Sequence, residues 1–143
     1  MYLPQKTNFL TVSTHVNFTD DELKHLLDII GIEKHTPKYI LYQACAKANH
    51  IVCIRVDDEL IAVARSMDDN CWNANIDFIA IHPAHDNEDI QNLLMTTMLT
   101  QLNCVKNIHV TATIGGNMPL LCRKLGIPSV KSHNSIKLVQ NFG

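Results

Sequence analysis

The feature that most constrains the fold is a change of hydrophobic period near the middle of the chain. Residues 51–56 (IVCIRV), 60–65 (LIAVAR) and 74–81 (ANIDFIAI) are short segments rich in β-branched and other apolar side chains. Stretches rich in Asp separate them, which is typical of tight turns. The pattern predicts three consecutive strands of an antiparallel meander.

A helix and another strand are predicted after this meander. Apolar residues recur at helical spacing from Ile90 to Leu102, which predicts a helix over 87–102. Residues 107–114 (NIHVTATI) predict a strand. Because a helix separates this strand from the one over 74–81, we expect the two strands to be parallel.

The first fifty residues predict one strand and two helices. Residues 9–16 alternate loosely, as in a strand. Thr19 and Glu22 form the capping pattern of a helix start, and Gly31 is a natural stop for that helix. A second helix is expected over 36–49, with a proline at its first position. Its buried side is predicted to carry Ile40, Ala44 and Cys45.

The C-terminal part predicts a short helix over 118–125, which Gly126 ends, and a last strand over 135–139. Together these elements predict one α+β domain with a mixed sheet over residues 1–143. A chain of this length buries about 70% of its unfolded surface when it folds.

Charge and cysteine content narrow the classes of function. The net charge of −2 gives no reason to expect a nucleic-acid or membrane partner, and no apolar run approaches the roughly 20 residues of a membrane span. The N-terminus lacks the regions of a signal peptide. Five cysteines without a C-x-x-C pair indicate reduced thiols in a cytoplasmic protein. His82 and His85 have no cysteine nearby, so no metal site is predicted.

Three local patterns resemble one family. Residues 79–83 (IAIHP) match an L-A-V-x-P strand end, and residues 123–127 (RKLGI) match an E-K-L-G-F segment. Residues 58–65 are similar to the hairpin that precedes them in that family. The chain thus resembles the GNAT superfamily, the N-acetyltransferases that use acetyl-coenzyme A. The resemblance implies a mixed, mostly antiparallel sheet with helices on both faces and a parallel pair of strands at the centre.

The loop after Pro83 departs from that family. The family's R-G-x-G-x-G/A loop exposes backbone N–H groups to the coenzyme A diphosphate. Here Asp86 stands at the Arg position, and the three small positions hold Asn87, Asp89 and Gln91. A carboxylate about 4 Å from a phosphate charge costs roughly 1 kcal/mol in water and about 4 kcal/mol at an effective dielectric constant of about 20. The acids suit the start of the helix instead, so the family's usual diphosphate contact is not expected.

The resemblance also implies which residues would act. Asp77 stands where relatives carry a catalytic carboxylate, and Cys122 stands at the position of a catalytic tyrosine. A solvent-facing Asp and a buried Cys are the structural alternatives. The residues implied for acetyl-coenzyme A binding are Ile79, Ala80, Ile81, Asn87, Asp89, Ile90, Gln91 and Asn117.

Three hypotheses follow. The first is an acyl-coenzyme A-dependent N-acyltransferase that acetylates a small-molecule or peptide amine, with a homodimer as one assembly that the family would allow. The second is a non-catalytic GNAT-like interaction or regulatory module that no longer binds coenzyme A. The third is a cysteine-based enzyme that uses Cys122 or Cys71 with a histidine.

Overall fold

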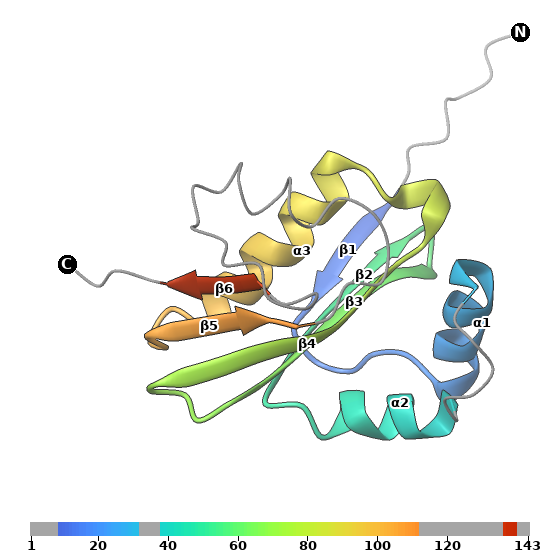
Figure 1. The fold of residues 1–143 in the computed structure, drawn as a ribbon. Helices are drawn as coiled ribbons and strands as arrows, with labels where there is room; N and C mark the ends of the chain where they lie inside the picture. Colours follow the sequence, from blue (N-terminus) through green and yellow to red (C-terminus); the bar gives the residue numbers. More distant parts are fainter. Residues whose placement is uncertain (1–8, 32–37, 112–135, 140–143) are drawn as a thin grey trace, which may run out of the picture.

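Six strands form one sheet whose spatial order equals their order in the chain (Figure 1). The computed structural model describes residues 9–31, 38–111 and 136–139. The strands are β1 (Leu10–Ser13), β2 (His50–Val56), β3 (Glu59–Asp68), β4 (Asn73–Ile81), β5 (Asn107–Val110) and β6 (Ile136–Val139). The helices are α1 (Asp20–Ile30), α2 (Lys38–Ala46) and α3 (Glu88–Gln101), and a 3₁₀ turn, η1 (Pro83–His85), precedes α3.

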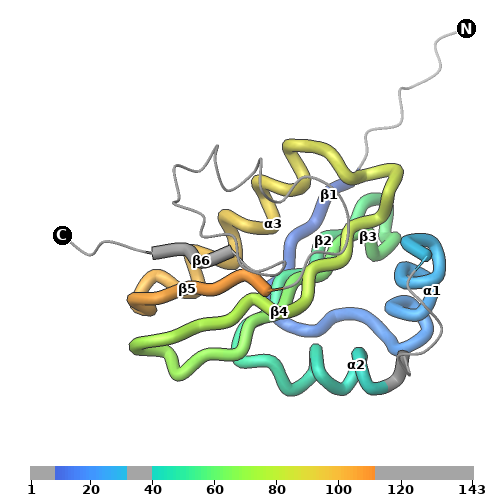
Figure 2. Tube along the Cα trace, in the orientation of Figure 1, coloured from blue at the N-terminus to red at the C-terminus, as the bar shows by residue number. Residues whose placement is uncertain are grey.

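Among the described strands, one pair of neighbours is parallel. β4 and β5 run in the same direction, with Asn73 opposite Asn107 and Ile76 opposite Val110. The other four pairs are antiparallel. Figure 2 shows the chain leaving β4 and returning to β5 by way of α3. The predicted α+β class, the mixed sheet and the parallel pair are therefore confirmed.

Local sequence explains where α1 begins and ends. The Thr19 hydroxyl accepts a hydrogen bond from the Glu22 backbone N–H, and the Glu22 carboxylate accepts one from the Thr19 N–H. This reciprocal capping satisfies two donors that a helix start otherwise leaves unpaired. Gly31 ends the helix at φ +85°, a backbone angle that favours glycine.

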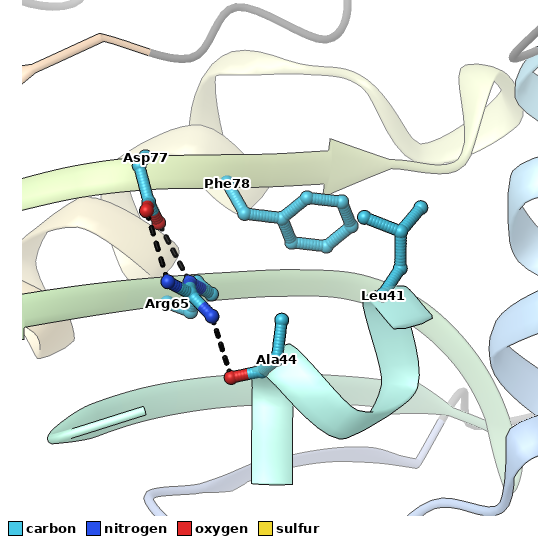
Figure 3. A pocket seen from close by; sticks show the side chains of 5 residues that line it. All are labelled: Leu41, Ala44, Arg65, Asp77 and Phe78. Atoms are coloured by element: carbon cyan, nitrogen blue, oxygen red, sulfur yellow. Dashed lines mark hydrogen bonds and ion pairs between the residues drawn. The ribbon is translucent and has the colours of Figure 1, made fainter. Parts of the chain in front are cut away.

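A β-bulge interrupts β4 at Asp77. Arg65 of β3 lies opposite Phe78, whereas the next residue, Ser66, lies opposite Ile76. Asp77 is therefore an extra residue without a partner of its own in β3. Because the bulge breaks the alternation of side chains, Asp77 and Phe78 both lie on the face of the sheet that α2 covers (Figure 3). No local pattern along β4 indicates this irregularity.

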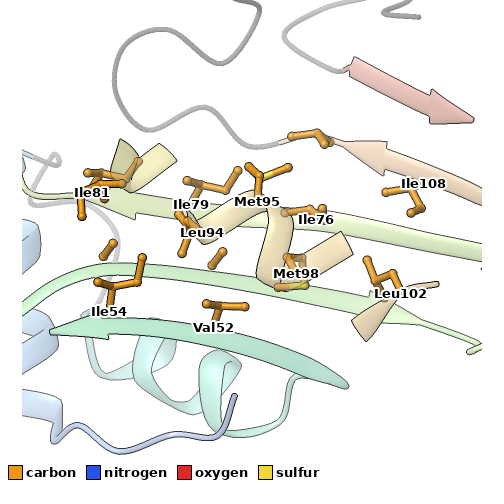
Figure 4. Packing of buried hydrophobic residues seen from close by; sticks show 14 of the residues in the cluster. Val52, Ile54, Ile76, Ile79, Ile81, Leu94, Met95, Met98, Leu102 and Ile108 are labelled. Atoms are coloured by element: carbon orange, nitrogen blue, oxygen red, sulfur yellow. The ribbon is translucent and has the colours of Figure 1, made fainter. Parts of the chain in front are cut away.

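Helices cover both faces of the sheet, as expected. α3 packs on one face, where Leu94, Met95 and Met98 lie against the isoleucines of β4 (Figure 4). α1 and α2 pack on the other face. Leu23 of α1 and Cys45 of α2 form a second cluster there with Phe78 of β4. Among the described helices, none is long and apolar enough to cross a membrane.

The structure corrects one prediction for α2, and it describes only part of the predicted C-terminal elements. Ile40, predicted to be buried, is 46% exposed, because α2 packs through Leu41, Tyr42 and Cys45 instead. The last predicted strand is present as β6, antiparallel to β5. The predicted helix over 118–125, with Cys122, and the loop residue Asn117 lie outside the described residues.

Candidate active site and the loop after β4

The Asp77 carboxylate is held by Arg65 from the neighbouring strand. Arg65 Nε donates to Asp77 Oδ1 at 2.7 Å, and Arg65 Nη2 donates to Asp77 Oδ2 at 2.9 Å. The third guanidinium nitrogen, Nη1, donates to the Ala44 carbonyl near the end of α2 at 2.6 Å. The two-point contact fixes the carboxylate's orientation, and the bond to α2 fixes the guanidinium. Asp77 is therefore neither isolated nor free to turn.

This ion pair lines a cavity between α2 and the sheet (Figure 3). The cavity has a volume of about 190 Å³ and is lined by Leu41, Ala44, Arg65, Asp77 and Phe78. The Asp77 side chain is 31% exposed and the Arg65 side chain 14% exposed, so both charges are accessible at the cavity while remaining partly desolvated. A half-buried pair of opposite charges beside apolar side chains has the chemistry of a binding site for a small polar ligand.

The last three residues of β4, predicted to contact the cofactor, have buried side chains. Ile79 and Ile81 point into the cluster under α3, and Ala80 points into the cluster under α1 and α2. Only their backbone can contact a ligand. The parallel pairing with β5 ends at Ile76, whose carbonyl accepts from the Thr111 N–H at 3.0 Å. Within the described residues, no strand pairs with β4 beyond that point on the β5 side.

The loop between β4 and α3 is closed by its own hydrogen bonds. His82 Nδ1 accepts from the Ala84 N–H at 3.0 Å, and the His82 carbonyl accepts from the His85 N–H at 2.8 Å. At the helix start, Asn87 Oδ1 accepts from the Ile90 N–H at 3.0 Å. These N–H groups belong to the segment that would face a diphosphate, and each already has a partner inside the loop.

Side chains also fill the positions that the resemblance assigns to glycines. Gln91 is 7% exposed, and its Nε2 donates to Asp86 Oδ1 at 2.6 Å. Ile90 is equally buried, in the cluster under α3. Glu88 and Asp89 add two acids to the first turn. Asp86, Asn87, Asp89 and Gln91 thus form a capped helix start that does not fit a diphosphate, because neither a positive charge nor a glycine approach is present.

Burial separates the cysteines into two kinds. Burial raises the pKa of the Cys45 thiol to about 12 and the pKa of the Cys53 thiol to about 11. Such thiols are protonated at neutral pH and do not serve as nucleophiles. Cys71, one of the two cysteines in the third hypothesis, is exposed in the turn before β4, where its backbone bonds to Asp69 and Lys106.

Arg65 is the charged residue of this site that the sequence analysis missed. It is the only charged residue in the segment LIAVAR, and Asp77 carries the opposite charge on the next strand. Opposite charges on adjacent strands often pair. The signal was present, but it could not be used without the register that the bulge creates. Leu41 and Ala44 were not predicted as site residues, because α2 carries no motif.

The sheet order, the single parallel pair and the two helical layers define the fold of the GNAT acetyltransferases, and comparison with solved structures shows that fold in this chain. No protein-family model and no curated protein sequence matches this chain.

Three structures illustrate the likeness. A GNAT-family acetyltransferase from Streptococcus pneumoniae has a TM-score of 0.70 at 15% identity, over 85% of this chain and 89% of that one. The ribosomal-protein-S18-alanine N-acetyltransferase of Escherichia coli has a TM-score of 0.70 at 10% identity, over 94% and 97%. N-acetylglutamate synthase from Neisseria gonorrhoeae, solved with coenzyme A and N-acetyl-glutamate, has a TM-score of 0.61 at 14% identity, over 88% and 30%.

Proposed function

We propose that this protein is an N-acyltransferase that moves an acyl group, in the simplest case acetyl, from a coenzyme A-type thioester to an amine. The observation that carries the proposal is the bulge at Asp77. It places a carboxylate in a cavity at the point where the parallel pairing of β4 and β5 ends. Bulges next to active sites commonly re-aim a side chain in this way. The GNAT fold supports the same reaction class.

The reaction needs two proton movements. The protonated acceptor loses one proton to become a nucleophilic amine, whose nitrogen then attacks the thioester carbonyl. The C–N bond forms, the C–S bond breaks, and the second amine proton is lost as the thiolate gains one. Asp77 is the group positioned to take a proton from the amine, with Arg65 holding it in orientation.

The donor is held without the usual diphosphate contact. The Ala84 and Ile90 N–H groups already donate inside the loop, and the loop carries acids, so it offers little attraction for the adenosine diphosphate portion. The backbone edge of β4 beyond Ile76, on the β5 side, is the surface that would accept the pantetheine arm, as a strand edge accepts an extended chain. In this proposal, recognition rests on the thioester and its arm.

The experiment compares acetyl-coenzyme A with acetyl-pantetheine as donors, using a panel of amines and mass spectrometry of the acetylated product. We expect turnover with both donors at rates within about tenfold of each other, because the diphosphate adds little binding energy. Asp77→Asn should lower the rate by about 10²–10⁴-fold, the usual size of a general-base contribution. Asp21→Asn, which changes an exposed carboxylate in the first turn of α1, serves as the control. Absence of product from every donor and amine would refute the proposal.

A second function is favoured by the closed loop. The Asp86–Gln91 and Asn87–Ile90 hydrogen bonds occupy the position of the diphosphate site. A module that has lost its donor and acts through protein contacts would show this arrangement. For such a module, calorimetry with acetyl-coenzyme A up to millimolar concentration gives no binding heat, and the amine panel gives no product. Any clear turnover excludes it.

A further inference from the structure

Arg65 retains hydrogen-bonding capacity at the cavity. A guanidinium has five N–H groups. Nε, Nη1 and Nη2 each donate one hydrogen bond, to Asp77 and Ala44. Five donors less these three leaves two, one on each terminal nitrogen, outside the bonds seen among the described residues. Terminal N–H groups form the end-on fork that receives a carboxylate.

Asp77 retains accepting capacity at the same place. Each of its oxygens accepts one hydrogen bond from Arg65, and a carboxylate has about four lone-pair sites. With 31% of the side chain exposed, the remaining sites are accessible at the cavity. A cation can therefore approach Asp77 without displacing Arg65.

The rest of the cavity is small and apolar. Leu41, Phe78 and the Ala44 methyl group form its other walls, and in Figure 3 the Phe78 ring and Leu41 lie side by side, away from the ion pair. Its volume of about 190 Å³ is below the range of roughly 300–1,000 Å³ that is usual for drug-sized ligands. The occupant is thus a small molecule with a charged end and an apolar end.

We propose that this cavity binds a small zwitterionic amino acid with an apolar side chain, with its carboxylate on Arg65 and its ammonium group on Asp77. The amino acid would be the acyl acceptor. That role rests on the proposed function, whereas binding of the amino acid does not. Its amine would then lie against the carboxylate that accepts its proton.

Charge balance explains why a zwitterion is preferred over a simple amine or a simple acid. The Arg65–Asp77 pair is neutral, so a ligand with one net charge would leave that charge uncompensated in a partly desolvated site. A zwitterion adds an opposite charge beside each member of the pair. An apolar side chain can then lie against Phe78 and Leu41.

The test measures binding in the absence of any acyl donor, by calorimetry or ligand-observed NMR. L-leucine is compared with isoamylamine, which lacks the carboxylate, and with 4-methylpentanoate, which lacks the amine. We expect saturable leucine binding, with each analogue weaker by about tenfold or more, the equivalent of about 1.4 kcal/mol. Equal binding of the amine and leucine, or no saturable binding of leucine up to millimolar concentration, overturns the proposal.

Two variants locate the site. Ala44→Leu fills the cavity and leaves both partners of the ion pair in place, so leucine binding should be lost while the melting temperature is kept. Ala46→Leu is the matched control, because it is the same substitution at an exposed position of the same helix, away from the cavity lining. It should leave leucine binding unchanged. Leucine binding that survives Ala44→Leu places the ligand elsewhere and overturns the proposal.

The outcomes separate this inference from the proposed function. Leucine binding without acyl transfer would support the amino-acid site and refute the transferase. Transfer to other amines with no leucine binding would refute the amino-acid site and leave the transferase standing.

Discussion

Gln91 Nε2 donates a hydrogen bond to Asp86 Oδ1 across 2.6 Å, and this contact joins the first turn of α3 to the loop before it. The buried amide and the carboxylate satisfy each other in the region where the fold's relatives would be expected to hold an anion. The helix start is complete without a ligand.

Restoring the expected loop chemistry should restore affinity for coenzyme A. In the double variant Asp86→Arg with Asn87→Gly, a repulsive carboxylate becomes a cation and the Ile90 N–H loses its internal acceptor. Removing repulsion of about 1–4 kcal/mol should tighten coenzyme A binding by at least about fivefold. Calorimetry at low salt measures this. Asp21→Arg, the same charge change in the first turn of α1, is the control, and equal gains in both proteins would show that only net charge matters.

The contact between α1 and β2 should make stability sensitive to acid. Hydrogen bonding from Arg55 lowers the pKa of Glu22 below its ordinary value of 4.5. A lowered folded-state pKa gives a contribution that is complete above the unfolded value and is lost as the pH falls through the folded value. Urea unfolding from about pH 7 to about pH 3 should show less acid destabilisation in Glu22→Gln than in the unaltered protein. Arg55→Gln removes the cause of the shift and should act in the same direction; a steeper acid loss in either variant would contradict the assignment.

Removing His50 should destabilise the fold. His50 Nδ1 lies 2.7 Å from Asp68 Oδ2, and the Asp68 side chain is only 1% exposed. The Ser66 hydroxyl donates to the same oxygen at 3.2 Å, which does not replace the imidazole. His50→Ala should lower the unfolding free energy by about 1–3 kcal/mol, the cost of a buried polar group that loses a partner.

The control for that variant is His25→Ala, an exposed change on α1 that should stay within about 0.5 kcal/mol. Adding Asp68→Asn to His50→Ala completes a double-mutant cycle. Strictly additive effects would show that the two side chains do not interact.

The cysteines should differ sharply in reactivity. Iodoacetamide at about pH 8, close to the reference pKa of a free thiol, should modify the exposed Cys71 and Cys104 in the folded protein. Cys45 and Cys53 should stay unmodified, because burial raises the pKa of each thiol to about 12 and about 11 respectively. Peptide mapping by mass spectrometry identifies the sites, and all four should react in denaturant. Early modification of Cys45 in the folded protein would contradict its burial.

Much of this fold could be predicted because its signals are local. The Thr19–Glu22 cap and the Gly31 stop depend on residues a few positions apart, and the structure contains both. The meander and the parallel return strand depend on hydrophobic period and on the intervening helix, which are also readable along the chain.

The site could not be predicted to the same extent, because it depends on register. Residues 73–78 alternate polar and apolar without a break, so nothing local marks the bulge. The Arg65–Asp77 contact joins residues 12 positions apart and exists only in that register. Ile40 was placed wrongly for a related reason, because the packing angle of α2 is decided by its neighbours and not by its own spacing.

The bulge also has a consequence for length variation in β4. Ile76 and Phe78 lie on opposite faces of the sheet, as adjacent residues of a regular strand would. A chain lacking Asp77 alone would therefore keep Phe78, Ile79, Ala80 and Ile81 on their present faces, with both cores intact. Deletion of any single residue next to Asp77 would instead move these side chains to the opposite faces of the sheet or leave a core position empty. The two cores do not require a residue at position 77, so a one-residue deletion there would separate the requirements of folding from those of the cavity.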